Sequence, residues 1–137
     1  MQIQITDQAI EIARLIQETS SEKAGALSVF LGTVRNHTQN KTVVGLEYEA
    51  YEGMALKKME EIALQASKQW PIESLNITHR VGKLKIGEVA VLIAVATPHR
   101  QQSFEACQFL IDTLKEVVPI WKKEIFEDGE VWVAAHP

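Results

Sequence analysis

Basic residues gather in one short stretch of the chain, residues 111–124 (IDTLKEVVPIWKKE), together with a proline and a tryptophan. Lys115 lies near the end of a predicted helix. Lys122 and Glu124 share one face of the strand predicted to follow, and Lys123 lies on its other face. A lysine beside a carboxylate and flanked by aromatic residues loses hydration, which lowers its pKa toward values suited to proton transfer. A surface salt bridge, with Lys115 complementing the helix dipole, is the alternative that requires no function.

A second pair of candidates, His99 and Arg100, falls in the first turn of a predicted helix. Thr97 is expected to cap this helix, and Pro98 suits its first position. Unpaired backbone N–H groups and the positive end of the helix dipole point outward there, so an imidazole and a guanidinium would complete a phosphate or carboxylate site. A solvated helix start is the alternative.

Arg35 ends the apolar run FLGTVR and opens a polar loop, residues 35–42. Binding residues often lie where a strand gives way to a loop, and Gly32 permits close backbone approach there. An exposed arginine at a loop edge is the alternative. His79 and Arg80 are also adjacent, but they lie within a predicted strand. Because successive strand residues face opposite ways, we expect these two to have a structural role.

Cys107, the single cysteine, occupies the apolar stripe of a predicted helix, so we expect a buried and unreactive thiol. One cysteine excludes a disulfide within the chain, and a reducing cytoplasm is the expected location. The histidines at positions 37, 79, 99 and 136 show no metal-ligand spacing. The residues alone thus predict basic groups that bind an anion, without a named reaction.

The elements that position these groups fit one domain, residues 1–137. The net charge of −4 argues against a general nucleic-acid or anionic-membrane surface. No apolar run approaches the roughly 20 residues of a membrane span, and the first residues lack the pattern of a signal peptide.

Hydrophobic periodicity divides the chain into alternating strands and helices. Strands are expected at residues 2–6, 25–34, 43–51, 74–81 and 88–97, and helices at 7–19, 53–70 and 98–118. A hairpin follows at residues 120–135, with Asp128-Gly129 as its tight turn. The order predicts an α+β fold with helices packed on a mixed sheet.

The predicted core follows from apolar stripes at helical or strand spacing. The strand at 88–97 is apolar on both faces and is expected to be central. The predicted buried positions elsewhere are Ala9, Ile12, Ala13 and Ile16; Val44, Leu46, Tyr48 and Ala50; Ala55, Met59, Ile62, Ala63, Ala66 and Trp70; and Phe104, Cys107, Ile111, Leu114 and Val118.

Six stretches between about residues 24 and 133 together resemble one known family, the large, catalytic subunit of molybdopterin synthase. Any one of them alone would be weak, but six in the family's order are specific. They are GALSVFLGTVRNHT, LEYEAYEGMA, HRVGKLKIGE, ATPHRQQSFEAC, IDTLKEVVPIWKKE and DGEVW.

The resemblance implies an α/β-hammerhead fold and a homodimer within a heterotetramer, with a small ubiquitin-like subunit at each end. The small subunit ends in Gly-Gly bearing a thiocarboxylate, which enters a pocket of the large subunit. Two sulfurs then pass to cyclic pyranopterin monophosphate (precursor Z) to form the dithiolene of molybdopterin. On this reading the chain binds no cofactor of its own, because the partner supplies the sulfur.

The resemblance also implies the site residues. Lys115 and Lys122 match catalytic positions, and Lys123, which points the other way on its strand, is expected to be solvated despite matching the pocket wall. The substrate-binding set implied is Thr33, Val34, Arg35, His99, Arg100, Lys115, Lys122, Lys123 and Glu124.

Two other classes of protein remain open. One is a non-catalytic dimeric module that binds an anionic metabolite through Arg35, His99 and Arg100 and does not need Lys115. The other is an assembly protein whose exposed hairpin edge at residues 120–135 pairs with another chain. The sequence also leaves open whether the loop 35–42 closes over a ligand.

Overall fold

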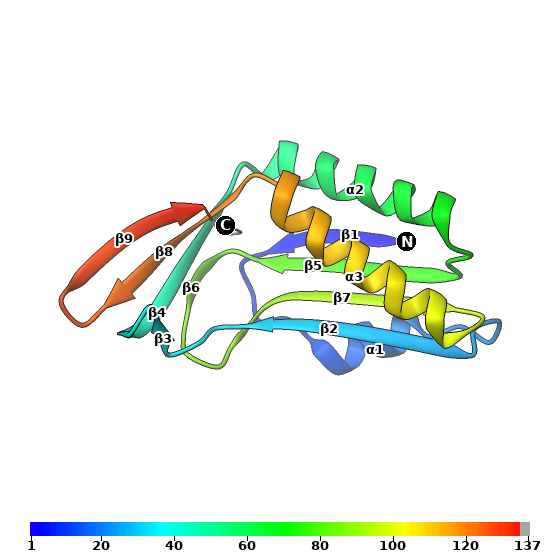
Figure 1. The fold of residues 1–137 in the computed structure, drawn as a ribbon, viewed down its shortest axis with the longest axis horizontal. Helices are drawn as coiled ribbons and strands as arrows, with labels where there is room; N and C mark the ends of the chain where they lie inside the picture. The colour runs from blue at the N-terminus through cyan, green and yellow to red at the C-terminus, as the bar shows by residue number, and fades with distance from the viewer. Residues whose placement is uncertain (135–137) are drawn as a thin grey trace.

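The computed structural model describes residues 1–134, with the backbone alone for residues 132–134, and contains two β-sheets set end to end (Figure 1). The first sheet has the order β1-β5-β7-β2, where β1 is Gln2–Thr6, β5 is Ser74–Arg80, β7 is Val89–Thr97 and β2 is Ala26–Thr33. β1 runs parallel to β5, and the other neighbours are antiparallel, so this sheet is mixed as predicted. β7 lies inside it and is buried from Ala90 to Thr97, which confirms the central strand.

The second sheet is antiparallel and carries the C-terminal hairpin. Its order is β3-β4-β8-β9, and β6 also pairs with β4. The strands are β3 (His37–Thr38), β4 (Lys41–Ala50), β6 (Gly82–Leu84), β8 (Ile120–Phe126) and β9 (Gly129–Ala134). The α+β class is therefore confirmed, but the strands form two sheets, whereas the sequence had suggested one.

Helices cover both faces of the first sheet (Figure 1). α2 (Glu52–Gln69) and α3 (Arg100–Val117) pack on one face, and α1 (Ile12–Thr19) packs on the other. The predicted stripe of α2 is confirmed, since its buried residues are Ala55, Met59, Ile62, Ala63 and Ala66. Within the described residues, no helix combines the length and apolar character that crossing a bilayer requires.

The start of α3 differs from the prediction. The helix begins at Arg100 with His99 as its N-cap, and the His99 N–H donates to Gln102 Oε1 at 3.2 Å. Thr97 instead donates its hydroxyl to the His99 carbonyl, 2.7 Å away. Phe104 was expected in the core but is 57% exposed. At about 100° per residue, the buried arc centres on Ser103, Leu110 and Leu114, which leaves Phe104 at its margin.

α1 is shorter than predicted, and its buried face is different. Leu15 and Thr19 are the buried residues, whereas Ala9 and Ala13 are exposed. Leu15 belongs to a small core cluster with Leu92 and other residues of the first sheet. The tertiary contact with β7 therefore decided which side of this short helix turned inward.

Two irregularities in the second sheet also changed the predicted positions. The β4–β8 register shifts between Val43 and Gly45, so Val43 is buried and Val44 is 48% exposed, contrary to the predicted face. At the hairpin, Glu127 and Asp128 form the turn, because Phe126 pairs directly with Gly129. The predicted turn at Asp128-Gly129 was one residue too late.

Two segments taken as connections contain strands. The loop 35–42 holds β3, and a two-residue turn joins it to β4 at Gln39 and Asn40, where φ is +48° and +67°. Two consecutive positive φ angles are typical of a tight hairpin turn. The connection at residues 82–87 holds β6, which pairs with β4. Both short strands extend the second sheet, and β3 also contributes Thr38 to the site described below.

Candidate functional site

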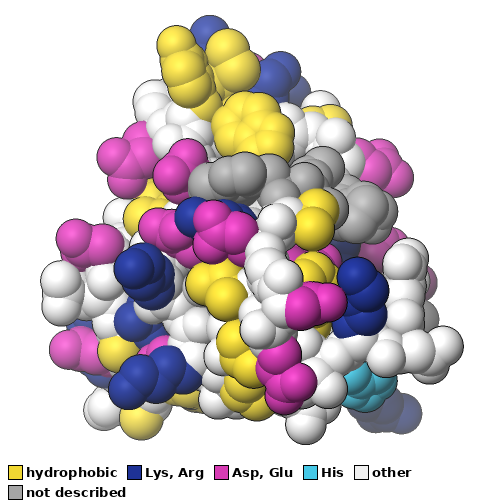
Figure 2. Space-filling view, turned by 90° about the vertical axis from the view of Figure 1, so that its left-hand side faces the viewer, with side chains coloured by type: hydrophobic (Ala, Val, Ile, Leu, Met, Phe, Trp, Pro, Cys, Tyr) yellow, Lys and Arg dark blue, Asp and Glu magenta, His cyan; other side chains and the backbone are white. Residues whose placement is uncertain are grey.

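A hollow of about 550 Å³ opens between the β3–β4 hairpin and the β8–β9 hairpin. Figure 2 shows this end of the molecule, where basic and acidic side chains are mixed among apolar ones. The lining contains groups from positions 35–41 and 122–131, which strand pairing brings together. These residues are Arg35, Thr38, Gln39, Lys41, Lys122, Glu124, Phe126 and Val131.

Lys122 and Glu124 form the most enclosed charged pair of this hollow. Lys122 Nζ lies 3.8 Å from Glu124 Oε1, and the two side chains are 19% and 8% exposed. The other carboxylate oxygen, Glu124 Oε2, is buried and has no hydrogen-bond partner among the described residues. The sequence had favoured a surface salt bridge here, whereas the structure shows a largely buried pair with unused acceptor capacity.

Burial lowers the pKa of Lys122, and the positive charges of Arg35 and Lys115 lower it further, while Glu124 opposes them. Lys115 stands in the last turn of α3 and is exposed, as expected for a lysine that complements the helix dipole. The structure thus places Arg35, Lys115 and Lys122 within electrostatic reach of one another. Such a cluster can bind an anion and can bring an ammonium closer to deprotonation.

Tyr48 lies next to Lys122 on the neighbouring strand and is not among the residues that line the hollow. The sequence presented it only as an apolar strand position. It stands opposite Lys122 in the β4–β8 register and is 8% exposed. Burial, with a smaller contribution from the charge of Glu124, raises the pKa of Tyr48 to about 12. Its ring meets that of His79 edge to face, with centroids 5.2 Å apart. In the sequence, the only signals for Tyr48 were its place in the alternation of β4 and the glutamates on either side of it.

Lys123 points to the opposite face of β8, as the strand alternation predicted. Its ammonium lies 3.1 Å from Glu47 Oε1 and 3.5 Å from Glu130 Oε1. The side chain is 18% exposed, so it is engaged in ion pairs where the sequence suggested a solvated lysine. It is not among the residues that line the hollow.

The end of β2 brings only one of its three candidates to the hollow. Arg35 lines it, whereas Thr33 is exposed at the strand end and pairs in register with Val89. Val34 is 3% exposed and packs in the core, with both its backbone N–H and its carbonyl hydrogen-bonded to the segment 87–88. The structure therefore does not bring the Val34 side chain to the hollow.

His99 and Arg100 lie at the other end of the first sheet. They follow Thr97, which pairs with Ala26 at the start of β2, while Arg35 follows the far end of that strand. Eight strand residues span roughly 25 Å. Because β2 and β7 are antiparallel, the two sets of cations cannot meet within one chain, and their predicted convergence does not occur there. Both residues are exposed.

The sequence as a whole matches a known family. A family model described as MoaE protein matches residues 5–117 of the chain.

This chain belongs to the MoaE protein family.

The molybdopterin synthase catalytic subunit of Halalkalibacterium halodurans is 49% identical over 129 residues, which cover 94% of this chain and 83% of the relative. The crystal structure of molybdopterin synthase from Staphylococcus aureus matches with a TM-score of 0.90 and 43% identity, covering 94% of each chain. A complex of subunits 1 and 2 of the molybdopterin-converting factor from Helicobacter pylori matches with a TM-score of 0.80. Its identity of 24%, over 98% of this chain and 93% of that one, shows the fold alone.

In this MoaE-family chain the thiol is structural. Cys107 is 8% exposed, its Sγ lies 4.0 Å from the Ile93 carbonyl oxygen, and burial raises its pKa to about 11. The predicted burial of the cysteine is confirmed, and a buried thiol that stays protonated is a poor nucleophile. His79 is fully buried with Nδ1 2.8 Å from the Arg80 carbonyl oxygen, and Arg80 pairs with Glu88 at 3.0 Å, so both have the structural contacts expected of them.

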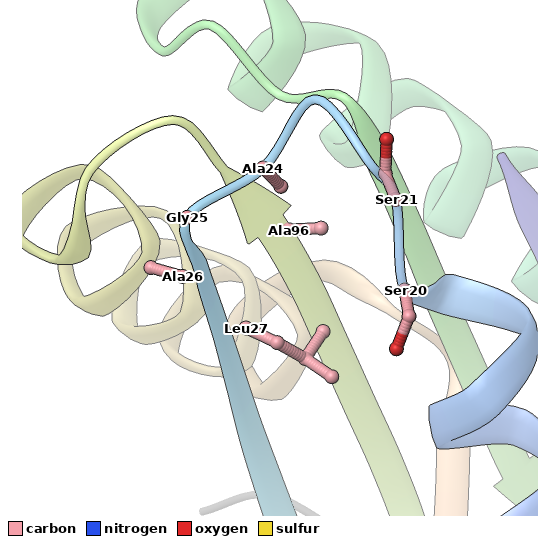
Figure 3. Close-up of a pocket in the computed structure, with 7 residues that line it drawn as sticks. All are labelled: Ser20, Ser21, Ala24, Gly25, Ala26, Leu27 and Ala96. Carbon is pink, nitrogen blue, oxygen red and sulfur yellow. The ribbon is translucent and has the colours of Figure 1, made fainter.

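A hollow at the other end of the first sheet of this MoaE-family fold offers less chemistry. Near the start of β2, small residues and two serines surround a hollow of about 170 Å³ (Figure 3). Ser20 and Ser21 are its polar side chains, and none of its described lining residues is ionisable. Across residues 1–134, no three His, Cys, Asp or Glu side chains gather closely enough to hold a metal ion, and His136 lies outside that range.

Proposed function

We propose that this chain is the catalytic subunit of a molybdopterin synthase that transfers two sulfurs to cyclic pyranopterin monophosphate to form the dithiolene. The observation that carries the proposal is the hollow lined by Arg35, Lys122 and Glu124 beside Lys115, in a chain of the MoaE family. A cationic hollow suits both a phosphorylated pterin and the negatively charged end of a thiocarboxylated partner.

The sulfur arrives on the partner, a small ubiquitin-like subunit ending in Gly-Gly. Its thiocarboxylate sulfur forms a bond to a carbon of the pterin side chain as the bond from that carbon to a phosphate oxygen breaks. The phosphate opens to a monoester that stays on the pterin, and a thioester then joins the two molecules. Water then cleaves the acyl–sulfur bond, which leaves the sulfur on the pterin and a carboxylate on the partner. A second thiocarboxylated subunit repeats the transfer at the neighbouring carbon, whose oxygen leaves as water. Because the sulfur arrives on the partner, the chain needs neither a thiol nor a cofactor of its own, and the buried Cys107 takes no part.

The roles of the cations follow from their positions. Arg35 binds the cyclic phosphate and stabilises the charge that develops as a phosphate oxygen departs. Lys122, with a lowered pKa, holds the partner's carboxylate or the phosphate as a point charge. Lys115, at the rim, transfers protons during sulfur attack and thioester hydrolysis.

His99 and Arg100 enter the proposal through a second copy of the chain. A two-fold homodimer can bring the far end of one protomer to the hollow of the other, which would complete the anion site. With one small subunit at each end, the assembly is a heterotetramer, and we place it in the cytoplasm.

A single-turnover assay tests this function. The full chain is combined with thiocarboxylated small subunit and cyclic pyranopterin monophosphate, and the dithiolene pterin is detected. Lys115→Ala is run alongside, with its folding checked by circular dichroism. Because Lys115 is exposed, this variant is expected to fold normally and make no product.

Each outcome decides between the classes of protein. Product from the wild type alone supports both the synthase and the role of Lys115. Product from neither, although the pterin binds, favours a non-catalytic module that binds an anionic metabolite. Product from both keeps the synthase and removes Lys115 from the catalytic set.

A further inference from the structure

The turn between β6 and β7, residues 85–88, is held by one carboxylate that uses both of its oxygens. Glu88 Oε1 accepts the Lys85 backbone N–H at 2.7 Å, and Oε2 accepts Arg80 Nη1 at 3.0 Å. The Arg80 side chain is 14% exposed and that of Glu88 34%. The two hydrogen bonds lower the pKa of Glu88, so the carboxylate is charged at neutral pH.

The backbone of the same turn forms hydrogen bonds with Val34, the residue directly before Arg35. The Val34 N–H donates to the Glu88 carbonyl oxygen at 3.0 Å, and the Gly87 N–H donates to the Val34 carbonyl oxygen at 2.9 Å. The Val34 side chain is also buried in the core, so both its backbone and its side chain are held in place. Arg35 is the next residue and lines the cationic hollow, so the position of the turn sets where its side chain begins.

The pairing of β2 is irregular near its end, so these hydrogen bonds are needed to hold Val34 in place. The register shifts between Gly32 and Thr33, so that Gly32 pairs with Val91 but Thr33 pairs with Val89. A Cβ at Gly32 would lie 2.6 Å from Val91 Cγ1, so the Val91 side chain fills the space beside Gly32 just before the shift. Bulges of this kind redirect the side chains that follow them. Regular pairing therefore does not determine the path to Arg35, and the turn does.

We propose that Glu88, with Arg80, is a positioning pair that aims Arg35 into the cationic hollow for an anionic ligand. The inference rests on the proposed function for the identity of that ligand, cyclic pyranopterin monophosphate. An isolated surface ion pair contributes little to any property of a protein. This pair differs because the Glu88 carboxylate also accepts a hydrogen bond from the Lys85 backbone N–H and so fixes the turn. The backbone of that turn also forms hydrogen bonds with Val34.

A double-mutant cycle on the full chain tests the coupling. Binding of cyclic pyranopterin monophosphate is measured by calorimetry for wild type, Arg35→Ala, Glu88→Ala and the double variant. Loss of the charged contact in Arg35→Ala is expected to weaken binding roughly tenfold, and Glu88→Ala a few-fold. If Glu88 acts through Arg35, the double variant binds no more weakly than Arg35→Ala. The proposal is overturned if the fold-losses in affinity of the two single variants multiply in the double variant. It is also overturned if Glu88→Ala binds with wild-type affinity.

Two further variants separate positioning from general damage. Glu88→Gln keeps an oxygen for the Lys85 N–H and loses the charge, so its binding should lie between those of the wild type and Glu88→Ala. It also supplies a folded variant if Glu88→Ala is unstable. Glu61→Ala removes a comparable surface partner, 3.4 Å from Lys58 on α2, and should leave binding unchanged. A loss in Glu61→Ala as large as in Glu88→Ala contradicts a specific role for the turn.

A readout without ligand keeps this inference distinct from the proposed function. The Arg35 guanidinium lowers the pKa of Lys122, so displacing it raises that pKa. Lysine side-chain NMR should show a rise in Arg35→Ala and a smaller rise in Glu88→Ala. An unchanged Lys122 titration in folded Glu88→Ala or Glu88→Gln overturns the positioning role, even if the wild type binds the pterin. Absence of pterin binding by the wild type removes the proposed function, while this titration still decides the role of Glu88.

Discussion

The two ends of the first sheet carry similar residue types in different surroundings. At one end, Arg35 and Lys122 face a hollow, and Lys122 is largely buried beside Glu124. At the other end, His99 and Arg100 are exposed in the first turn of α3. The nearby hollow at that end is lined by small residues and serines.

The difference shows that closeness in sequence is a poor guide to shared chemistry. His99 and Arg100 are adjacent yet lie in an open setting, whereas Arg35 and Lys122 are 87 positions apart and share one hollow. What separates the two ends is the second sheet, which largely buries Lys122 and Glu124, whereas Arg35 is exposed like His99 and Arg100. Burial lowers the local dielectric around that pair and strengthens its charge interactions. Chemistry is therefore expected first at the enclosed end.

Replacing Lys122 gives the largest expected effect. Lys122→Ala should reduce single-turnover sulfur transfer roughly 100- to 1,000-fold, because it removes an enclosed cation aimed at the reacting charges. Lys123→Ala is the matched comparison, since it removes the neighbouring lysine from the opposite face of β8. We expect it to retain activity within about twofold, because the ion pairs with Glu47 and Glu130 that it breaks lie on the face away from the hollow. Equal losses in the two variants would contradict the assignment of one face of β8 to the site.

Mixed dimers test whether the open end serves a second copy. Lys115→Ala and Arg100→Ala chains are co-expressed with different tags, and tandem purification isolates dimers that contain one of each. If each site takes Lys115 from one protomer and Arg100 from the other, the mixed dimer keeps one intact site and about half of wild-type activity. Both parent dimers should be nearly inactive. A mixed dimer as inactive as its parents would assign Arg100 to a role outside the shared site.

The buried residue His79 makes the stability of the fold sensitive to acid. Burial lowers the pKa of His79 to about 4, from 6.5 in the unfolded chain. Between these values the unfolded chain binds a proton that the folded chain does not. The contribution of His79 to the free energy of unfolding is therefore complete above pH 6.5. It is lost as the pH drops toward 4, by about 3 kcal/mol in total. Urea titrations of wild type and His79→Gln at pH 7 and pH 4 measure this, and the variant should lose correspondingly less. Equal losses would show that His79 is charged in the folded state.

The smallest expected effect concerns the titration of Lys122. Glu124 raises the pKa of Lys122, whereas Arg35 and Lys115 lower it. Glu124→Gln should therefore lower the Lys122 pKa further, and Lys115→Gln should raise it. Lysine side-chain NMR across alkaline pH measures both shifts. Shifts in the same direction in the two variants would show that local structure, rather than charge, controls this ammonium.

Much of the fold was predictable from local patterns. The stripe of α2 and the doubly apolar strand β7 followed from periodicity, because each buries a face that the sequence repeats over many residues. The failures were short or irregular. β3 and β6 are two and three residues long, too short for any period to register. The exposed Val44 follows from a shift in pairing, which depends on the partner strand β8.

The sequence by itself determined the α+β class, the family, the buried cysteine and the alternation that sends Lys122 and Lys123 to opposite faces of β8. Each of these depends on residue order along one segment, or on the order of several segments. Only the tertiary structure decided that Arg35 and Lys122 share a hollow and that His99 and Arg100 lie at the far end. It also decided that Tyr48 stands opposite Lys122 and that the Glu88 carbonyl accepts the Val34 N–H. These outcomes depend on which strands pair and in what register, and strand pairing joins residues whose distance in sequence carries no signal.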